Sequence, residues 1–164
     1  MTSVVVRPMR VSDLPAVFDL QCRAYPPGYH EPTDALASRL AVGAAFCFVA
    51  SVGDALVGYV FAHPWAGPPP ALHAPLPVCD AADHVFFHDL AVCPQRRGVG
   101  AAQRLLDALF AAARACAIHN ARLVAVGEAL PFWRRHGFSA QPIVLHPSYG
   151  DAQHMARSLI TRTH

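Results

Sequence analysis

The stretch "LAVCPQRRGVG", Leu90 to Gly100, most constrains what this chain can fold into. An apolar run, "HVFFHDLAV", ends at a proline, and two arginines and two glycines precede a long segment rich in alanine and leucine. This order predicts a strand that passes through a glycine turn into a helix. The first amides of a helix lack intrahelical partners and carry partial positive charge. The junction therefore predicts a binding site for an anion.

Two glycines and two arginines define this turn. Gly98 and Gly100 would let the backbone approach a ligand closely, and Arg96 and Arg97 would add positive charge. The alternative is an ordinary tight turn with its arginines in solvent. The chain has no G-x-x-x-x-G-K-[ST] and no early G-x-G-x-x-G, which excludes two other phosphate motifs. The element that remains is Q-x-x-G-x-G from Gln95, with a pyrophosphate as its natural ligand.

Periodicity predicts the remaining elements. We expect strands at 4–8, 44–52, 55–63, 84–92, 121–128, 141–145 and 152–159, and helices from a Ser12 cap to 20, at 33–40, 98–116 and 129–137. The order β-α-α-β-β-β-α-β-α-β-β predicts an α/β (α+β) fold with a curved mixed sheet and helices on both faces. We expect a single domain, residues 1–164. The proline-rich segment 64–82 would form a lid or wall of a binding site.

Composition limits the function classes. Hydrophobic residues make up 54% and charged residues 15% of the chain, and the net charge is only +2. No global charge therefore favours nucleic acid or a membrane surface as a partner. The opening "MTSVVVRPMR" lacks a signal-peptide hydrophobic region, and no apolar run reaches membrane-spanning length. We expect a soluble, cytoplasmic protein.

Cysteines and histidines give no sign of a disulfide framework or a metal. Five cysteines, an odd number with no CxxC, are expected to be reduced apolar fillers. Ten histidines are scattered in a pattern that matches no compact ligand set. We therefore expect no metal site.

Three segments carry a resemblance to a known family. The Q-x-x-G-x-G element resembles the coenzyme-A-binding motif of the GCN5-related N-acetyltransferases, the GNAT superfamily. The segment "VVVRPMRVSDLPAVFDL" resembles the family's opening strand and helix, and "EALPFWRRHGF" resembles its late signature. The resemblance covers nearly the whole chain and implies the GNAT fold, with a splayed sheet. Within the superfamily the chain is most similar to arylalkylamine N-acetyltransferases, through "HDLAV", "EALPFW" and "QHMARSL".

The resemblance implies acetyl-CoA as cosubstrate and a coenzyme-A site along the strand and the turn. In such enzymes the strand before the glycine motif splays from its neighbour and binds pantetheine with its freed backbone. By position, the Leu90 amide would donate to the thioester oxyanion, and the Val92 backbone would hold pantetheine. The residues assigned to coenzyme A are Leu90, Ala91, Val92, Gln95, Arg96, Arg97, Gly98, Val99, Gly100 and Ala101.

The resemblance also implies direct transfer to an amine, which must lose a proton to a base. His88 matches one base-forming histidine of the arylalkylamine branch, although the partner two residues earlier is Phe86 here. A plain polar strand histidine is the alternative reading. Because strand side chains alternate, His84 shares the face of His88 and would act through water. By the same alternation, Asp89 points to the opposite face.

The late helix departs from the family. Trp133 stands where a tyrosine usually protonates the thiolate, and an indole N–H donates hydrogen bonds without being a useful acid. Either the thiolate leaves unaided, or another group serves, with Tyr149 and Cys116 as weak substitutes. We assign the acceptor pocket to an aromatic-walled set: Phe61, His63, Trp65, Phe86 and Trp133.

These observations predict an N-acetyltransferase that acts on a primary amine, aromatic or hydrophobic and small. One alternative keeps the chemistry and changes the acceptor to a protein N-terminus or lysine. Another is a non-catalytic acyl-CoA-binding module, favoured by Trp133. We expect a monomer or homodimer with no nucleic-acid or membrane partner.

Overall fold

The computed structural model describes residues 3–70, 76, 81–125, 127–142, 145 and 152–160. Within them lies a seven-stranded sheet of order β1-β2-β3-β4-β5-β7-β6. The strands are β1 (Val4–Pro8), β2 (Phe48–Val52), β3 (Ala55–Trp65), β4 (His84–Val92), β5 (Asn120–Ala125), β6 (Ser139–Ala140) and β7 (Gln153–Ser158). All neighbouring pairs are antiparallel except β4 and β5.

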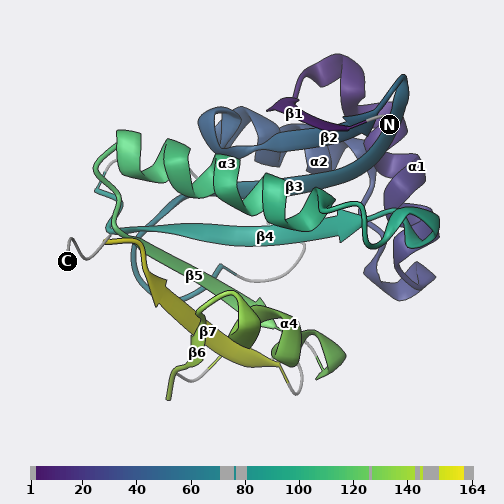
Figure 1. Ribbon diagram of the computed structural model, residues 1–164. Coiled ribbons are helices and arrows are strands. Elements are labelled where there is room, and N and C mark those ends of the chain that lie inside the picture. The colour runs from purple at the N-terminus through teal and green to yellow at the C-terminus, as the bar shows by residue number, and fades with distance from the viewer. Residues whose placement is uncertain are drawn as a thin grey trace.

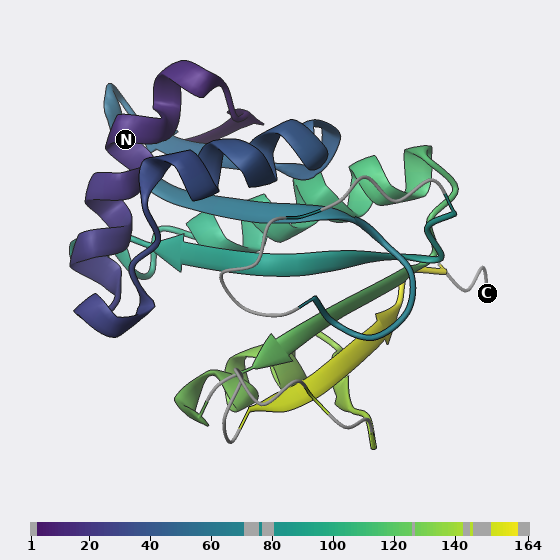
Figure 2. The same cartoon turned by 180° about the vertical axis from the view of Figure 1, so that it is seen from behind.

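Helices cover both faces of this sheet. They are α1 (Leu14–Ala24), α2 (Thr33–Val42), α3 (Ala101–Ala115) and α4 (Leu130–Arg135). Figure 1 shows α3 lying across one face of β3 and β4, and Figure 2 shows α1 and α2 on the opposite face. The element order and the mixed sheet predicted from the sequence are confirmed.

Close packing of α3 depends on one apolar stripe and one glycine. Leu105, Leu106, Leu109 and Phe110 are buried along one face of the helix. A Cβ at Gly58 of β3 would lie 3.1 Å from Cδ1 of Leu105. The bare backbone of this glycine lets the helix approach the sheet, and each fully buried leucine contributes about 2 kcal/mol.

Helix starts differ from the sequence prediction at two positions. A 3-10 turn, Val11–Asp13, precedes α1, so the α-helix begins at Leu14 and Ser12 does not cap it. Asp13 instead accepts the Arg10 amide at 2.7 Å. The helix expected from residue 98 begins at Ala101, because Gly98 and Gly100 have φ values of +95° and +82°.

The strand predicted at 141–145 is also placed differently. The described strand β6 is short and ends at Ala140, and the Gln141 amide donates to the carbonyl oxygen of His154. Residues 143 and 144 lie outside the described residues. The last predicted strand, 152–159, agrees with β7.

A splay between β4 and β5 opens the sheet. The two strands pair only where Val85–Phe87 meets residues 121–123. Beyond Phe87 they diverge into a V, visible from both sides of the molecule (Figures 1 and 2). Among the described residues, β4 has a strand partner from residue 88 onward only on its β3 side. The splayed sheet that the resemblance implies is confirmed.

Four of the five cysteines are described, and all four are free thiols: Cys22, Cys47, Cys93 and Cys116. Cys79 lies outside the described residues. Among the described side chains no group of three or more potential ligands is arranged to hold a metal ion. In the same part of the chain, no helix has the length and apolar character needed to cross a bilayer.

Candidate functional site

The open edge of β4 faces the V. The Cys93 amide donates to the carbonyl oxygen of Val57 in β3 at 2.7 Å. Backbone groups of successive strand residues point alternately to the two edges. Leu90 and Val92 therefore direct their N–H and C=O groups away from β3, to the edge from which β5 has diverged. Both backbone positions expected from the resemblance lie at this open edge of β4.

Ala91, which was assigned to the same site, has a different environment. It pairs with Tyr59 of β3, and its side chain is 4% exposed. By the same alternation its backbone groups point toward β3. The structure therefore gives Ala91 neither a free backbone group nor an exposed side chain in the cleft.

Tyr25 contributes a hydroxyl at this edge, and the sequence analysis missed it. It is the C-cap residue of α1, and its hydroxyl donates to the Leu90 carbonyl oxygen at 2.7 Å. Burial, followed by the nearby Asp89 carboxylate, raises the pKa of Tyr25 well above its usual range. The group is therefore a hydrogen-bond donor at ordinary pH. In the sequence, the only sign of this role is the position of Tyr25 directly after the first helix.

A β-bulge interrupts β4 at His88. Phe61 pairs with Asp89 and Ala62 with Phe87, which leaves His88 as the extra residue. A bulge breaks the strict alternation of side chains on which sequence reasoning depends. It also lies immediately before the edge that faces the V.

The bulge brings Asp89 to the face that holds His88. The Tyr59 hydroxyl donates to Oδ2 of Asp89 at 2.6 Å, and Tyr59 and His63 share one face of β3. The His63 ring lies 5.1 Å from the His88 ring. The prediction that Asp89 points to the opposite face is therefore wrong, because the extra residue resets the alternation.

The Asp89 carboxyl is a titratable group beside the cleft. Burial raises its pKa, while the hydrogen bond from Tyr59, the nearby Tyr25 hydroxyl and the charge of Arg39 act in the opposite direction. Arg39 is itself buried and paired with Glu31. Asp89 is thus a second proton acceptor next to the half-buried His88.

Four of the five predicted acceptor residues lie together on this face. Phe61, His63 and Phe86 are at most 2% exposed. The His63 ring lies 5.7 Å from the Phe86 ring and 5.4 Å from the ring of Trp65. Burial lowers the pKa of His63 to about 4, so its imidazole is neutral at pH 7. These side chains form a packed aromatic layer against one another.

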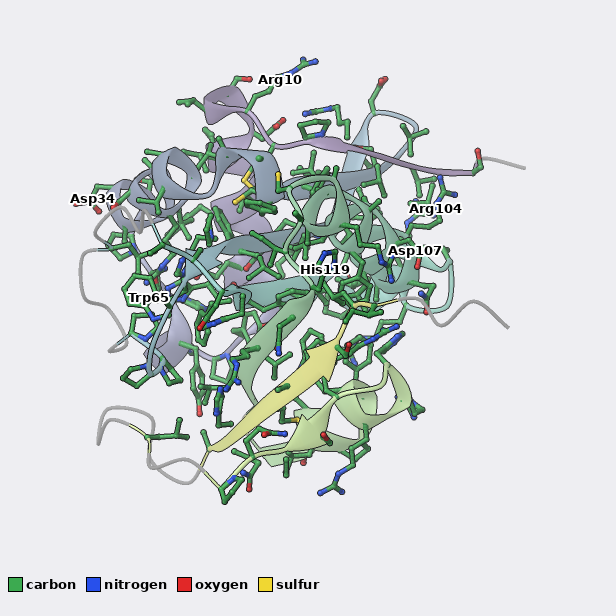
Figure 3. The ribbon with its side chains drawn as sticks, turned by 90° about the vertical axis from the view of Figure 1, so that its left-hand side faces the viewer. Arg10, Asp34, Trp65, Arg104, Asp107 and His119 are labelled. Carbon is green, nitrogen blue, oxygen red and sulfur yellow. The ribbon has the colours of Figure 1, made fainter. Side chains whose placement is uncertain are left out.

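Trp133, the fifth predicted acceptor residue, lies apart from the others. Its ring is 5.7 Å from Phe87 and 5.3 Å from Phe138. Phe87 packs against Phe110 of α3, so Trp133 belongs to the α3 face of the sheet. Figure 3 shows Trp65 on the opposite side of the sheet from Arg104 and Asp107 of α3.

The glycine turn leaves open space before α3. Cβ atoms built on Gly98 and Gly100 would meet nothing within 4 Å, so backbone conformation, with φ positive at both, favours glycine there. The first helical bond of α3 runs from the Arg104 amide to the Gly100 carbonyl. Because helical bonding begins with the Arg104 amide, the amides of residues 101–103 have no intrahelical partner, and a helix start of this kind favours an anion.

The two arginines of the turn lie in different surroundings. Arg96 and Gln95 line a hollow of about 500 Å³ with Arg23 of α1 and the start of β3. Gln95 also accepts a hydrogen bond from the Cys93 thiol at 3.1 Å. The positive charge of Arg97 acts on Tyr25 and opposes part of the rise in the pKa of that hydroxyl. Val99 is 43% exposed.

Comparison with known proteins agrees with this geometry. The profile of the acetyltransferase (GNAT) family matches residues 14–138. No curated protein sequence matches the chain significantly. The fold matches the GphF GNAT-like decarboxylase in complex with isobutyryl-CoA, with 23% identity and a TM-score of 0.84, over 95% of this chain and 100% of that one.

Two acetyltransferases also share the fold. One is the ribosomal-protein-S18-alanine N-acetyltransferase from Escherichia coli, with 16% identity, a TM-score of 0.71 and coverage of 98% and 96% of the two chains. The other is the PaiA N-acetyltransferase from Thermoplasma acidophilum in complex with coenzyme A, with 13% identity, a TM-score of 0.74 and coverage of 95% and 99%. At these identities the likeness concerns the fold, and the likeness to the arylalkylamine branch stays a prediction.

Proposed function

The chain belongs to the acetyltransferase (GNAT) family, and from this premise we propose that it transfers an acetyl group from acetyl-CoA directly to a small primary amine, aromatic or hydrophobic. The observation that carries the proposal is the unpaired edge of β4. This edge runs past Leu90 and Val92 into the glycine turn and the N-terminus of α3. A strand edge that continues into a glycine turn and a helix start suits an extended ligand with an anionic end.

Coenzyme A fits these groups. The amides from Gly98 to Ala101 would hold the pyrophosphate, with Arg97 adding positive charge. The Val92 backbone would hold pantetheine by hydrogen bonds that a neighbouring strand would otherwise make. When bound, acetyl-CoA supplies an activated thioester.

The Leu90 amide would then stabilise negative charge on the thioester oxygen. A backbone N–H held in place before the reaction needs no reorganisation as charge develops. The Tyr25 hydroxyl supports this arrangement because it binds the carbonyl of the same residue at 2.7 Å. Its raised pKa favours a role as a steady donor over one as an acid.

A base must take the proton of the attacking amine. His88 is the proposed acceptor, directly or through water, since it lies in the bulge beside the cleft. Asp89 is the next candidate, because the bulge turns it to the same face. Trp133 lacks a useful acidic proton, so we propose that the thiolate departs without protonation from that position.

The test is a coenzyme A release assay across a panel of aromatic and aliphatic amines and peptides with free N-termini, with products identified by mass spectrometry. We expect N-acetyl products from small aromatic or hydrophobic amines. If only peptides were acetylated, the acceptor would be a protein and not a small amine. Binding of acetyl-CoA with no turnover of any amine would refute catalysis and favour a binding module. Release of carbon dioxide from a carboxylated acyl-CoA without amine consumption would favour the reaction named for GphF.

A further inference from the structure

A second hollow of about 320 Å³ lies on the acceptor face of the sheet. It is lined by Gly67, Pro68, Asp83, His84 and Arg122. Arg122 is the strand partner of Phe86, and His84 shares the face of Phe86 on β4. The hollow therefore lies at the closed end of the V, beside the aromatic layer.

The rim of this hollow is held by two hydrogen bonds. The Asp83 amide donates to the Trp65 carbonyl oxygen at 3.1 Å, which closes the ends of β3 and β4. The indole N–H of Trp65 donates to the Pro68 carbonyl oxygen at 2.8 Å. These contacts fix the backbone at residues 65–68 against the start of β4.

Arg122 brings a positive charge into the hollow. Its side chain is half-buried, and among the residues the structure describes no carboxylate lies within ion-pair distance of it. Asp83 lines the same hollow, but its side chain is 74% exposed and its Oδ1 binds Nδ1 of His84 at 2.5 Å. A guanidinium with no carboxylate beside it can pair with an anionic group of a ligand.

His84 provides an independent sign of a ligand. The residue is 2% exposed, and its Nε2 has no hydrogen-bond partner in the described part of the chain. Because Nδ1 donates to Asp83, Nε2 of the neutral ring is an acceptor. Burial is the main cause that lowers the pKa of His84, which favours this neutral form. A buried acceptor without a donor carries a free-energy cost that a ligand N–H or O–H would remove.

We propose that this hollow binds a carboxylate of the substrate through Arg122, with a neighbouring N–H or O–H of the same ligand donated to Nε2 of His84. The inference rests on the proposed acetyltransferase function and narrows its acceptor to an amine that carries a carboxylate. An acyl group that ends in a carboxylate is a second source of the same chemistry. Arginine suits this role because its planar fork binds both carboxylate oxygens.

The distance to the cleft sets the length of the ligand. Arg122 lies level with Phe86, which pairs with His63, and Leu90 pairs with Val60, three residues away along β3, or about 10 Å at 3.3 Å per residue. Phe86 is buried, whereas Val124, the next residue of β5 on the same face, is half-buried. The ligand would run along β5, so several carbons should separate the amine from the carboxylate.

The first experiment compares matched acceptors. Acetyl transfer is measured for ω-amino carboxylates from 3-aminopropanoate to 8-aminooctanoate and for alkylamines of equal length. We expect kcat/KM at least tenfold higher for one carboxylate of intermediate length than for its alkylamine. Arg122→Gln should abolish this preference and leave the alkylamine rate unchanged, and Arg122→Lys should restore part of it. Arg134→Gln, on the exposed end of α4, is the control and should keep the preference.

A second measurement does not need turnover. The side-chain N–H signal of Arg122 and the ring signals of His84 are followed by NMR during titration with the preferred ω-amino carboxylate, or with 5-aminopentanoate if none turns over. Saturable shifts that Arg122→Gln removes would support the site even if no amine were acetylated, in which case the proposed acetyltransferase function alone would fail. Amine turnover with no carboxylate preference, no effect of Arg122→Gln and no NMR shift would overturn the site and leave the function standing.

The source of the carboxylate is distinguished with two acyl donors. Succinyl-CoA and butyryl-CoA have equal chain length and differ by the terminal carboxylate. If the acceptor supplies the carboxylate, Arg122→Gln should leave the ratio of their kcat/KM values unchanged. A ratio in favour of succinyl-CoA that falls at least tenfold in Arg122→Gln would assign the hollow to the acyl chain instead.

Discussion

His88 and Asp89 are consecutive residues that share one face of the sheet, because the bulge inserts an extra position between the pairs of β3 and β4. His88 packs against the neutral His63, and Asp89 accepts the Tyr59 hydroxyl. Two proton acceptors therefore lie next to the edge of β4 that carries Leu90. The imidazole becomes positively charged when it takes a proton, whereas the carboxylate becomes neutral. Substituting His88 and Asp89 one at a time shows which of them accepts the amine proton.

If His88 accepts the amine proton, His88→Gln should lower the acetylation rate by about 10²-fold or more at neutral pH. The acidic limb of the pH–rate profile should flatten, since that limb reports protonation of the base. Coenzyme A affinity should barely change, because the side chain lies on the acceptor face. Steady-state kinetics from pH 5 to 9 and calorimetry with coenzyme A provide the measurements.

Asp89→Asn is the companion variant for this prediction. It keeps the shape of the side chain and removes the charge. A wild-type rate and pH profile in His88→Gln, with the acidic limb lost in Asp89→Asn, would reassign the base to Asp89.

Tyr25 permits a test that removes one atom. Tyr25→Phe keeps the ring and loses the donor to the Leu90 carbonyl, a net interaction of about 1 kcal/mol, or roughly fivefold in rate if it acts in the transition state. We expect kcat to fall by about that factor while coenzyme A affinity is retained. Tyr29→Phe, in the same connection and 53% exposed, should behave as wild type. Equal kcat values for the two variants would refute a role for the Tyr25 hydroxyl.

Among the elements of the fold, the connection from β4 to α3 combines three features that favour binding of an extended anionic ligand. The strand ends with a free edge, the glycines take positive φ, and the helix presents its first amides. The sequence predicted this junction well, because a turn and a helix start depend on local conformational preferences. The exact start of α3 was misplaced, since Gly98 and Gly100 remain outside the helix.

Gly100→Val should weaken coenzyme A binding at least tenfold, or about 1.4 kcal/mol. A Cβ branch at φ +82° strains the turn and fills the space before the α3 amides. Gly53→Val is the matched control, because Gly53 also has positive φ and no atoms near its Cβ position, but lies in the β2–β3 hairpin. Calorimetry should show lost affinity in the first variant alone. Equal affinity in both folded variants would contradict the anion site.

At the scale of the whole molecule, the buried histidines link stability to pH. Burial lowers the pKa of His63 from its ordinary value of 6.5 to about 4 in the folded state. Between these values the unfolded chain binds the extra proton, so stability is full above about pH 6.5 and decreases as pH falls toward 4. The loss from His63 at pH 5 is about 2 kcal/mol.

Urea unfolding at pH 7.5 and pH 5 checks this sign. His63→Phe removes the titrating ring, so its stability should change by about 2 kcal/mol less between the two pH values than that of wild type. His119→Gln, at an exposed position, should keep the wild-type difference. If His63→Phe lost as much unfolding free energy between pH 7.5 and pH 5 as wild type, His63 would not be the cause of that loss.

Local patterns in the sequence were enough to predict the order of the elements and the glycine turn. Apolar periodicity and turn residues act over a few neighbours, so the chain alone specifies strands such as 84–92 and the junction that follows. The assignment of Leu90 and Val92 to the ligand came from the resemblance to the family, and it stays a prediction. The divergence of β4 from β5 was predicted from the resemblance to a family, because the spacing of apolar residues contains no information about it.

Only the tertiary structure decided how distant residues meet. The bulge at His88 depends on the register of β3 against β4, and a shift of one residue moves a side chain to the other face. Asp89 therefore changed face, while Tyr25 reached Leu90 from the end of α1. The hollow that joins His84 to Arg122 depends on the pairing of β4 with β5. Such contacts join strands and helices that are far apart in the chain, where local preferences carry no information.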